Sequence, residues 1–161
     1  MKVFLIGCGA LGGAIARGVT KMPGASLVVF DLDHAKAVKI ARETLAPVVK
    51  TVEEGFAGAD LVVEAASQQA LRELAPKVLG RGLPLVALSV GALGDARFLE
   101  EITRLARDKK TKLLNPSGAI GGLDAVRAAA EAGRTEVTLV RAKAPEGFGL
   151  HGLTEAKILY E

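Results

Sequence analysis

The chain has 161 residues, 50% of them hydrophobic and 4% aromatic, and its formal net charge is +3. That length allows one full domain with a sizeable core, or one domain and part of a second. The basic residues are spread along expected helices rather than clustered with aromatics, which argues against a nucleic-acid partner.

The sequence carries no pattern that would direct the chain to a membrane or out of the cell. No segment is long and apolar enough to cross a bilayer, and the apolar start lacks the basic flank and cleavage site of a signal peptide. The single cysteine, Cys8, cannot form an internal disulfide, which favours a reducing compartment. We therefore expect a soluble, cytoplasmic protein. The scarcity of Asn, Gln and Met beside many charged residues is typical of a thermophile.

The first 31 residues read as strand, glycine turn, helix and strand, ending in an acid. An apolar strand enters the glycine turn at residues 7–12, a helical segment follows, and Pro23-Gly24 ends that helix. A second apolar run leads into Asp31. This order and spacing are typical of a dinucleotide-binding βαβ unit. The helical period places an inward face at Leu11, Ile15, Gly18, Val19 and Met22.

Each glycine of the turn has a separate expected role. Gly7 allows the sharp turn off the strand, Gly9 lets the backbone approach a pyrophosphate, and Gly12 lets the helix pack closely on the strand. The first N–H groups of the helix, at Ala10 and Leu11, would face the phosphates. A purely structural glycine turn, or a mononucleotide or adenosyl ligand, are the alternatives.

Asp31 is expected to bind the sugar of the same ligand. Its carboxylate would accept hydrogen bonds from the hydroxyls of the adenosine ribose. Its charge would repel a 2′-phosphate, so the sequence favours NAD as the cofactor, with NADP possible.

Helices and strands then alternate along the chain. Four residues, Asp33, Thr51, Ser67 and Asp95, can each cap the helix that follows. Further strands are expected at residues 47–49, 61–64, 84–88 and 112–114. The expected inward faces of three of these helices are Ala35, Val38, Ala41 and Leu45; Leu71, Leu74, Ala75 and Val78; and Phe98, Ile102, Leu105 and Ala106. Short links between the elements predict an α/β fold, a doubly wound parallel (Rossmann) sheet over residues 1–115.

Ligands of such sheets lie outside the carboxyl ends of the strands. Besides the glycine turn and Asp31, the loops at that edge contain small or polar residues against which a flat ligand could lie. The candidate cofactor contacts there are Ala65, Ala66, Ser67, Ser89, Gly91 and Ala92. The alternative is that these small residues only mark tight turns.

The pattern changes after residue 115. A second small-residue loop leads into a helix with Leu123, Val126 and Ala130 inward, which ends at Gly133. Residues 135–140 alternate as in an antiparallel strand with one wet face. We expect residues 116–161 to be the start of a truncated α+β second domain.

Four segments together resemble L-aspartate dehydrogenase. They are residues 7–12, 63–68, 89–93 and 116–124, and their order and spacing agree with that family along essentially the whole chain. The resemblance implies NAD(P)-dependent oxidative deamination of L-aspartate to iminoaspartate, which gives oxaloacetate and ammonia and in some organisms feeds NAD biosynthesis. It also implies a homodimer or larger assembly through the second domain, which would bind substrate, and a cofactor contact at Ala119.

The chain departs from that family beyond residue 161. Members continue with a segment that carries an Asn for the cofactor and the His assigned as proton donor, and neither is present in this sequence. No catalytic residue or metal ligand is therefore assigned. His34 reads as an exposed helix-start residue, His151 lies in a Gly-flanked tail, and Cys8 reads as structural. The alternatives are an NAD-binding module without turnover, or an enzyme like homoserine dehydrogenase or dihydrodipicolinate reductase.

Overall fold

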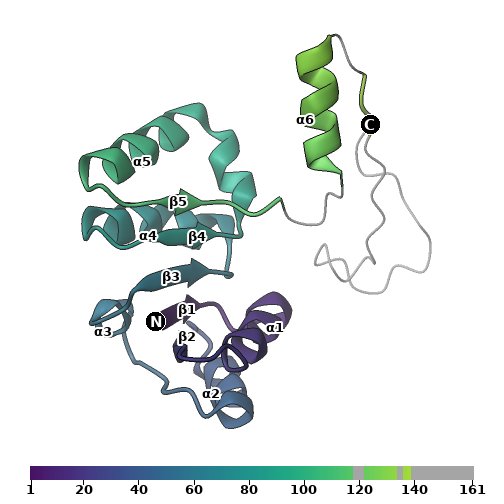
Figure 1. Cartoon of the computed structure of the whole chain (residues 1–161). Helices are drawn as coiled ribbons and strands as arrows, with labels where there is room; N and C mark the ends of the chain where they lie inside the picture. The colour runs from purple at the N-terminus through teal and green to yellow at the C-terminus, as the bar shows by residue number, and fades with distance from the viewer. Residues whose placement is uncertain (118–121, 134–135, 139–161) are drawn as a thin grey trace, which may run out of the picture. The chain divides into compact units, whose positions relative to one another are not determined.

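The computed structural model describes residues 1–117, 122–133 and 136–138 (Figure 1). The chain divides into two compact units, Met1–Gly118 and Ala119–Glu161, and each forms its own set of contacts. The prediction of a substrate and dimerisation domain over residues 116–161 stays a prediction.

A five-stranded parallel sheet forms the centre of the first unit. The strand order is β2-β1-β3-β4-β5, and β1 pairs with both β2 and β3. Ile6, the last residue of β1, lies opposite Phe30 on one side and Glu64 on the other. The strands are β1 (Lys2–Ile6), β2 (Ser26–Phe30), β3 (Leu61–Glu64), β4 (Leu85–Ala87) and β5 (Leu113–Leu114). The predicted doubly wound parallel sheet is confirmed.

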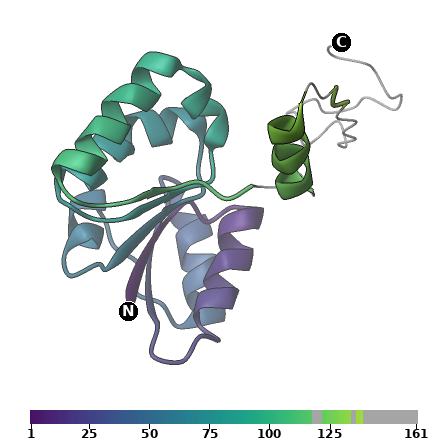
Figure 2. The same ribbon diagram turned by 45° about the horizontal axis from the view of Figure 1, so that its top comes forward.

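Helices cover both faces of this sheet (Figure 2). On one face lie α1 (Ala10–Val19) and α2 (His34–Thr44), whose buried side chains form a cluster with Val3 and Leu5 of β1. On the other face lie α3 (Val52–Phe56), α4 (Gln68–Gly80) and α5 (Ala96–Asp108), together with a short 3₁₀ helix, η1 (Val90–Gly94). Because side chains alternate along a strand, neighbouring residues of β1 supply both clusters.

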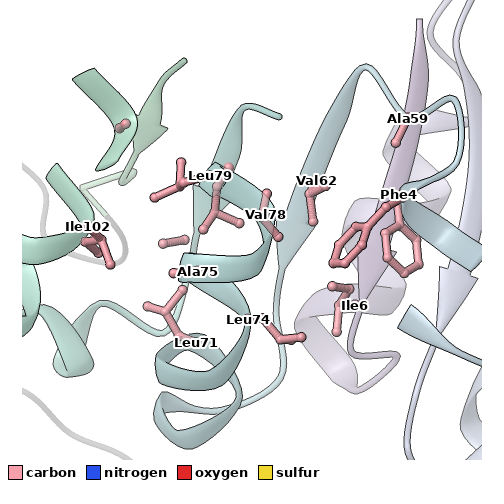
Figure 3. Close-up of a cluster of buried hydrophobic side chains, with 14 of the residues drawn as sticks. Phe4, Ile6, Ala59, Val62, Leu71, Leu74, Ala75, Val78, Leu79 and Ile102 are labelled. Atoms are coloured by element: carbon pink, nitrogen blue, oxygen red, sulfur yellow. The ribbon is translucent and has the colours of Figure 1, made fainter. Parts of the chain in front are cut away.

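The larger core lies between the sheet and α4 (Figure 3). Phe4 of β1 meets Phe56 of α3 edge to face, with ring centroids 5.7 Å apart. All four residues predicted for the inward face of α4 are buried: Leu71, Leu74, Ala75 and Val78. Burial of each large apolar side chain contributes roughly 1.5–3 kcal/mol, so this face holds α4 on the sheet.

The predicted inward face of α1 is partly wrong. Leu11 is 55% exposed and Met22 is 49% exposed, whereas the buried positions of this helix include Gly12 and Gly13. A Cβ built on Gly12 would lie only 1.9 Å from the carbonyl oxygen of Gly7. The helix therefore packs through its small residues, because close backbone approach leaves no room for large side chains.

Two predictions after β2 are also corrected. The buried residues of α2 are Ala37 and Ile40, while Leu45 is 91% exposed because it is the left-handed C-cap of the helix, with φ 57°. The strand predicted at residues 47–49 is reduced to a single bridge between Val48 and Val29. Pro47 carries no N–H group with which to extend such a ladder.

The predicted capping residues are confirmed. Asp33, Thr51, Ser67 and Asp95 each accept a hydrogen bond from a backbone N–H group in the first turn of the following helix. The inward face of α5 is confirmed as well: its residues Phe98, Ile102 and Ala106 are buried, and Leu105 packs against the same core.

In the second unit the structure describes one helix, α6 (Leu123–Ala132), followed by its C-cap Gly133 as predicted. Of the strand predicted at residues 135–140, only residues 136–138 are described, and they are not in a strand. Ala119 and His151 lie outside the described residues.

Candidate functional site

The glycine turn joins the end of β1 to the start of α1. Gly7 has φ +97°, a left-handed conformation, and a Cβ there would lie 2.6 Å from the carbonyl group of Ala65. A side chain at Gly7 would therefore be strained and would collide with the loop after β3. Gly9 differs, because a Cβ built on it would meet nothing within 4 Å. Gly7 and Gly12 are thus required by packing, and Gly9 leaves its side of the backbone open to a ligand.

The N-terminus of α1 carries donors that no described residue uses. Its N-cap is Gly9, and within the described part of the chain no side chain caps this end of the helix. The N–H groups of Ala10, Leu11 and Gly12 belong to the first turn, in which an α-helix supplies no partner. Together with the positive end of the helix dipole they form a site suited to phosphate.

The acid at the end of β2 is tied to the glycine turn. Asp31 is half-buried, and its Oδ2 accepts a hydrogen bond from the Cys8 N–H group at 2.6 Å. Its Oδ1 accepts one from the Asp33 N–H group at 2.8 Å. A carboxylate has about four acceptor positions, so Asp31 can hold both loops and still accept from sugar hydroxyls.

Cys8 is buried within the turn. Its Sγ donates to the carbonyl oxygen of Phe30 at 3.7 Å. Burial, and secondarily the charge of Asp31, raise the pKa of the Cys8 thiol to about 11. The thiol is therefore protonated near neutral pH and is no nucleophile there, which agrees with its predicted structural role.

A pocket of about 380 Å³ opens at the carboxyl edge of the sheet, beside Asp31. This volume is within the usual range of small-molecule sites. Apolar residues from β1, β2, α3 and α4 line part of it: Ile6, Phe30, Val52 and Leu74. Six of the predicted cofactor contacts also line it: Gly7, Gly9, Asp31, Ala65, Ala66 and Ser67.

Three charged residues of this pocket were not predicted from the sequence. Lys36 comes from α2, and Glu73 and Lys77 come from α4. Glu73 and Lys77 are four residues apart, which places them on one helix face, but only the fold brings that face next to the loop of Asp31. His34 is exposed at the first position of α2, as expected, and does not line the pocket.

The remaining predicted contacts lie outside the pocket lining. Ala10, Leu11 and Gly12 are at the start of α1, while Ser89, Gly91 and Ala92 are in the loop and 3₁₀ helix that follow β4. Gly91 is in contact with α4, because a Cβ on it would lie 2.4 Å from Nε2 of Gln68. The loops after β3 and β4 are therefore close neighbours.

Glu64 is the second feature that sequence analysis missed. It is the last residue of β3, it is fully buried, and its carboxylate accepts hydrogen bonds from the loops after β3 and β4. The signal available in the sequence was an acid that closes the apolar run Leu61-Val62-Val63.

Neither a metal-binding cluster nor a membrane-spanning helix occurs in the described part of the chain. Residues 1–117, 122–133 and 136–138 contain no group of three or more His, Cys, Asp or Glu that could hold a metal ion. In the same residues, no helix has the length and apolar character needed to span a membrane.

The sheet order, the glycine turn after the first strand, the uncapped helix start and the acid after the second strand define a dinucleotide-binding Rossmann domain. Comparison with protein families agrees with this class. Residues 7–116 match the family described as homoserine dehydrogenase, NAD binding domain, and the chain belongs to that family.

Comparison with individual proteins gives a more specific similarity than the domain family does. The chain is 38% identical over 152 residues to L-aspartate dehydrogenase of Methanosarcina mazei, covering 92% of this chain and 56% of the relative. It is 36% identical over 162 residues to L-aspartate dehydrogenase of Methanothermobacter thermautotrophicus, covering 99% of this chain and 63% of that protein. These similarities confirm the resemblance to L-aspartate dehydrogenase, and the chain spans a little over half the length of these relatives.

Solved structures support the fold. GenD2 from gentamicin A biosynthesis, in complex with NAD, matches with a TM-score of 0.70 at 23% identity, covering 82% of this chain and 38% of GenD2. UDP-N-acetylglucosamine 3-dehydrogenase from Acidithiobacillus ferrooxidans matches with a TM-score of 0.69 at 21% identity, covering 83% of this chain and 42% of that one.

Proposed function

We propose that the chain is the cofactor-binding part of an NAD(P)-dependent L-aspartate dehydrogenase. The observation that carries the proposal is the pocket at the carboxyl edge, bounded by Gly9 and Asp31, in a chain that is 38% identical to L-aspartate dehydrogenase of Methanosarcina mazei. When bound, the nicotinamide of the cofactor takes up the hydride that leaves Cα of L-aspartate.

The residues of the chain bind and orient in this proposal. The N–H groups of Ala10, Leu11 and Gly12 would hold the pyrophosphate, and Asp31 would hold the adenosine ribose. The apolar pocket wall would receive the adenine ring. The remaining predicted contacts, Ser89, Gly91, Ala92 and Ala119, would lie along the rest of the cofactor.

The mechanism also needs a group that exchanges protons with the substrate. The titratable side chains of the pocket are Asp31, Lys36, Glu73 and Lys77. All four line the side of the site assigned to adenosine, so none is assigned a catalytic role. We propose that residues 116–161 begin the domain that supplies substrate contacts and the homodimer interface.

A second candidate is an NAD-binding module without turnover. It is favoured by one observation: the titratable side chains that line the described pocket all lie on the side assigned to adenosine. The two candidates differ only in catalysis, because both require the Rossmann site.

One pair of measurements separates them. NAD binding to the purified chain is measured by calorimetry, and formation of reduced cofactor is followed by absorbance with L-aspartate and, as a control substrate, L-homoserine. We expect NAD to bind, and oxidation of L-aspartate would support the dehydrogenase over the module. Binding without turnover would support the module, and oxidation of L-homoserine alone would support the homoserine dehydrogenase alternative. Binding of neither NAD nor NADP in the same titration would contradict all three.

A further inference from the structure

Glu64 has a hydrogen-bonding pattern that the proposed cofactor contacts do not explain. Its Oε1 accepts from the Ala66 N–H group at 2.8 Å, from the Ser67 N–H group at 3.1 Å and from the Ser89 hydroxyl at 2.8 Å. Its Oε2 accepts from the Ser89 N–H group at 3.1 Å. One buried carboxylate therefore receives four hydrogen bonds from two loops.

Burial of a carboxylate in this position is energetically unfavourable for the fold. Transfer of such a group out of water is unfavourable unless its acceptor positions are filled. Among the residues that the structure describes, no salt bridge involves Glu64, so only hydrogen bonds compensate for its burial. An apolar residue at the end of the run Leu61-Val62-Val63 would complete the strand without this cost. The carboxylate instead fixes the geometry of the two loops.

The two loops lie on different parts of the ligand-binding edge. Ala66 and Ser67, after β3, line the pocket that contains Asp31. Ser89, after β4, does not line that pocket and follows the next strand in the sheet order. A dinucleotide extends across this edge, outside the carboxyl ends of the strands. The loop after β3 lines the pocket proposed for adenosine, and the loop after β4 lies one strand further from β2, where the nicotinamide half of the ligand would extend.

We propose that Glu64 is a positioning residue for the dinucleotide: it fixes the loop after β4 relative to the adenosine pocket, so that the nicotinamide half binds in register with the adenosine half. This inference rests on the proposed function, since it requires that the site take NAD. It assigns Glu64 no contact with the cofactor.

The substitution Glu64→Gln affects the two loops differently. The amide oxygen can keep the Oε1 position and its three donors, from Ala66, Ser67 and the Ser89 hydroxyl. The amide nitrogen then faces the Ser89 N–H group at the Oε2 position, where two donors meet and no hydrogen bond forms. The variant should loosen the loop after β4, which keeps the Ser89 hydroxyl as its one side-chain bond to residue 64, and should leave the loop after β3 held.

The test compares a whole dinucleotide with its adenosine half. The full 161-residue chain is titrated calorimetrically with NAD and with 5′-AMP. For Glu64→Gln we expect NAD affinity to fall about tenfold and AMP affinity to change less than about twofold, because one charged hydrogen bond is lost on the nicotinamide side.

A matched control lies at the other end of the same strand. Asp60 precedes β3, is exposed, and accepts a hydrogen bond from the Lys2 N–H group at 2.6 Å. Asp60→Asn removes the same charge at the opposite edge of the sheet, where its amide oxygen can keep the hydrogen bond from the Lys2 N–H group. We expect it to leave the ratio of NAD to AMP affinity unchanged.

The outcomes are distinct. Equal loss of NAD and AMP affinity in Glu64→Gln would show a general structural role and overturn the proposal, as would no loss at all. If Glu64→Gln does not fold, Glu64→Asp replaces it, because it keeps the charge but its shorter side chain cannot reach both loops; a loss of NAD affinity larger than that of AMP supports the proposal, and an unchanged ratio overturns it. A native chain that binds neither ligand would instead refute the proposed function itself.

Discussion

Asp31 Oδ2 and the Cys8 N–H group are 2.6 Å apart and form a hydrogen bond across 23 positions of the sequence. The acid after β2 therefore orders the middle of the glycine turn after β1, in addition to any contact with a sugar. A second hydrogen bond, from the Asp33 N–H group, fixes the carboxylate from its own loop. The same side chain shapes the phosphate site and serves the ribose site, which bears on how its substitution should be tested.

Replacement of Asp31 by Ala should weaken NAD more than NADP. The charge that accepts from the ribose hydroxyls is lost, but so is the repulsion of a 2′-phosphate. We expect NAD affinity to fall about tenfold, as is typical for loss of a hydrogen bond to a charged group. Calorimetric titration with each cofactor measures the ratio. Asp33→Ala is the control: it removes the helix cap on Ala35, at a cost of about 1 kcal/mol of stability, and should leave that ratio unchanged. Equal losses of both cofactors in Asp31→Ala would refute the ribose role.

Substitution by Ala should mainly weaken NAD binding at Gly9 and mainly lower stability at Gly12. Gly9→Ala places a methyl group where nothing lies within 4 Å, so it should cost only about 0.5 kcal/mol of stability yet weaken NAD about tenfold by obstructing the pyrophosphate. Gly12→Ala forces a Cβ to 1.9 Å from the Gly7 carbonyl oxygen and should lower the free energy of unfolding by about 2 kcal/mol or more. Urea unfolding and NAD titration of both variants give the comparison. A Gly9→Ala chain destabilised as much as Gly12→Ala would contradict the open geometry of the turn.

Cys8 should be nearly inert to thiol reagents in the folded chain. With its pKa at about 11, the thiolate fraction at about pH 8 is on the order of one in a thousand, and burial further limits access. The reaction rate with a chromogenic disulfide should rise as pH approaches 11. The same chain in guanidinium chloride should react rapidly, which serves as the control. Fast labelling of the native chain at neutral pH would show that the thiol is exposed.

Asp95 should make stability depend on pH in the acid range. Hydrogen bonding from the Phe98 N–H group, and next from Arg72, lowers the pKa of Asp95 below 3.8 in the folded chain. Because the folded pKa is the lower one, the ionised side chain stabilises the fold above its ordinary pKa, and this contribution is lost as pH falls through the folded value. Asp95→Asn keeps a good helix cap but loses the charge.

The measurement for Asp95 is urea unfolding across pH. Asp95→Asn should be less stable than the native chain near neutral pH, and the difference should disappear in acid below pH 3.8. Asp108→Asn, at the last residue of the same helix, is the control, because removal of a negative charge there relieves the helix dipole and should stabilise slightly. A difference for Asp95→Asn that persists at the lowest pH would exclude the charge as its cause.

Local signals in the sequence were sufficient for most of the fold. Short apolar runs predicted the strands of the sheet, and even the two-residue β5 falls within residues 112–114. The helix starts were predicted well because capping is local chemistry: Ser67 accepts from the Ala70 N–H group three residues away, as its position in the sequence implies.

The errors occurred where tertiary proximity decides. Leu11 is apolar at helical spacing but exposed, because α1 packs against the glycine turn through Gly12 and against α2 through Gly13. Met22 is exposed beyond the end of α1. Periodicity assigns faces by hydrophobicity and does not report how closely two backbones approach. Leu45 was placed on a helix face although it lies past the end of α2, where its left-handed cap turns it outward.

The candidate site also contains residues that local sequence signals predict and residues that only the tertiary fold brings together. The glycine turn and Asp31 follow a known spacing, so their position beside the pocket was predictable. The role of Glu64 was not predictable, because two of its four donors belong to Ser89, which is 25 positions away in the chain. Lys36 and Lys77 come from helices on opposite faces of the sheet and share the pocket only in the folded structure.

The parallel arrangement of all five strands has a practical consequence for handling the protein. The glycine turn, Asp31 and the loops after β3 and β4 all leave the sheet at one edge, whereas Met1 enters at the opposite edge, where its amino group bonds to the Gly24 carbonyl oxygen. A fusion tag or a sensor-chip linker attached at Met1 would leave the ligand-facing edge accessible to solution. Titrations on an immobilised chain should therefore reproduce those made in free solution.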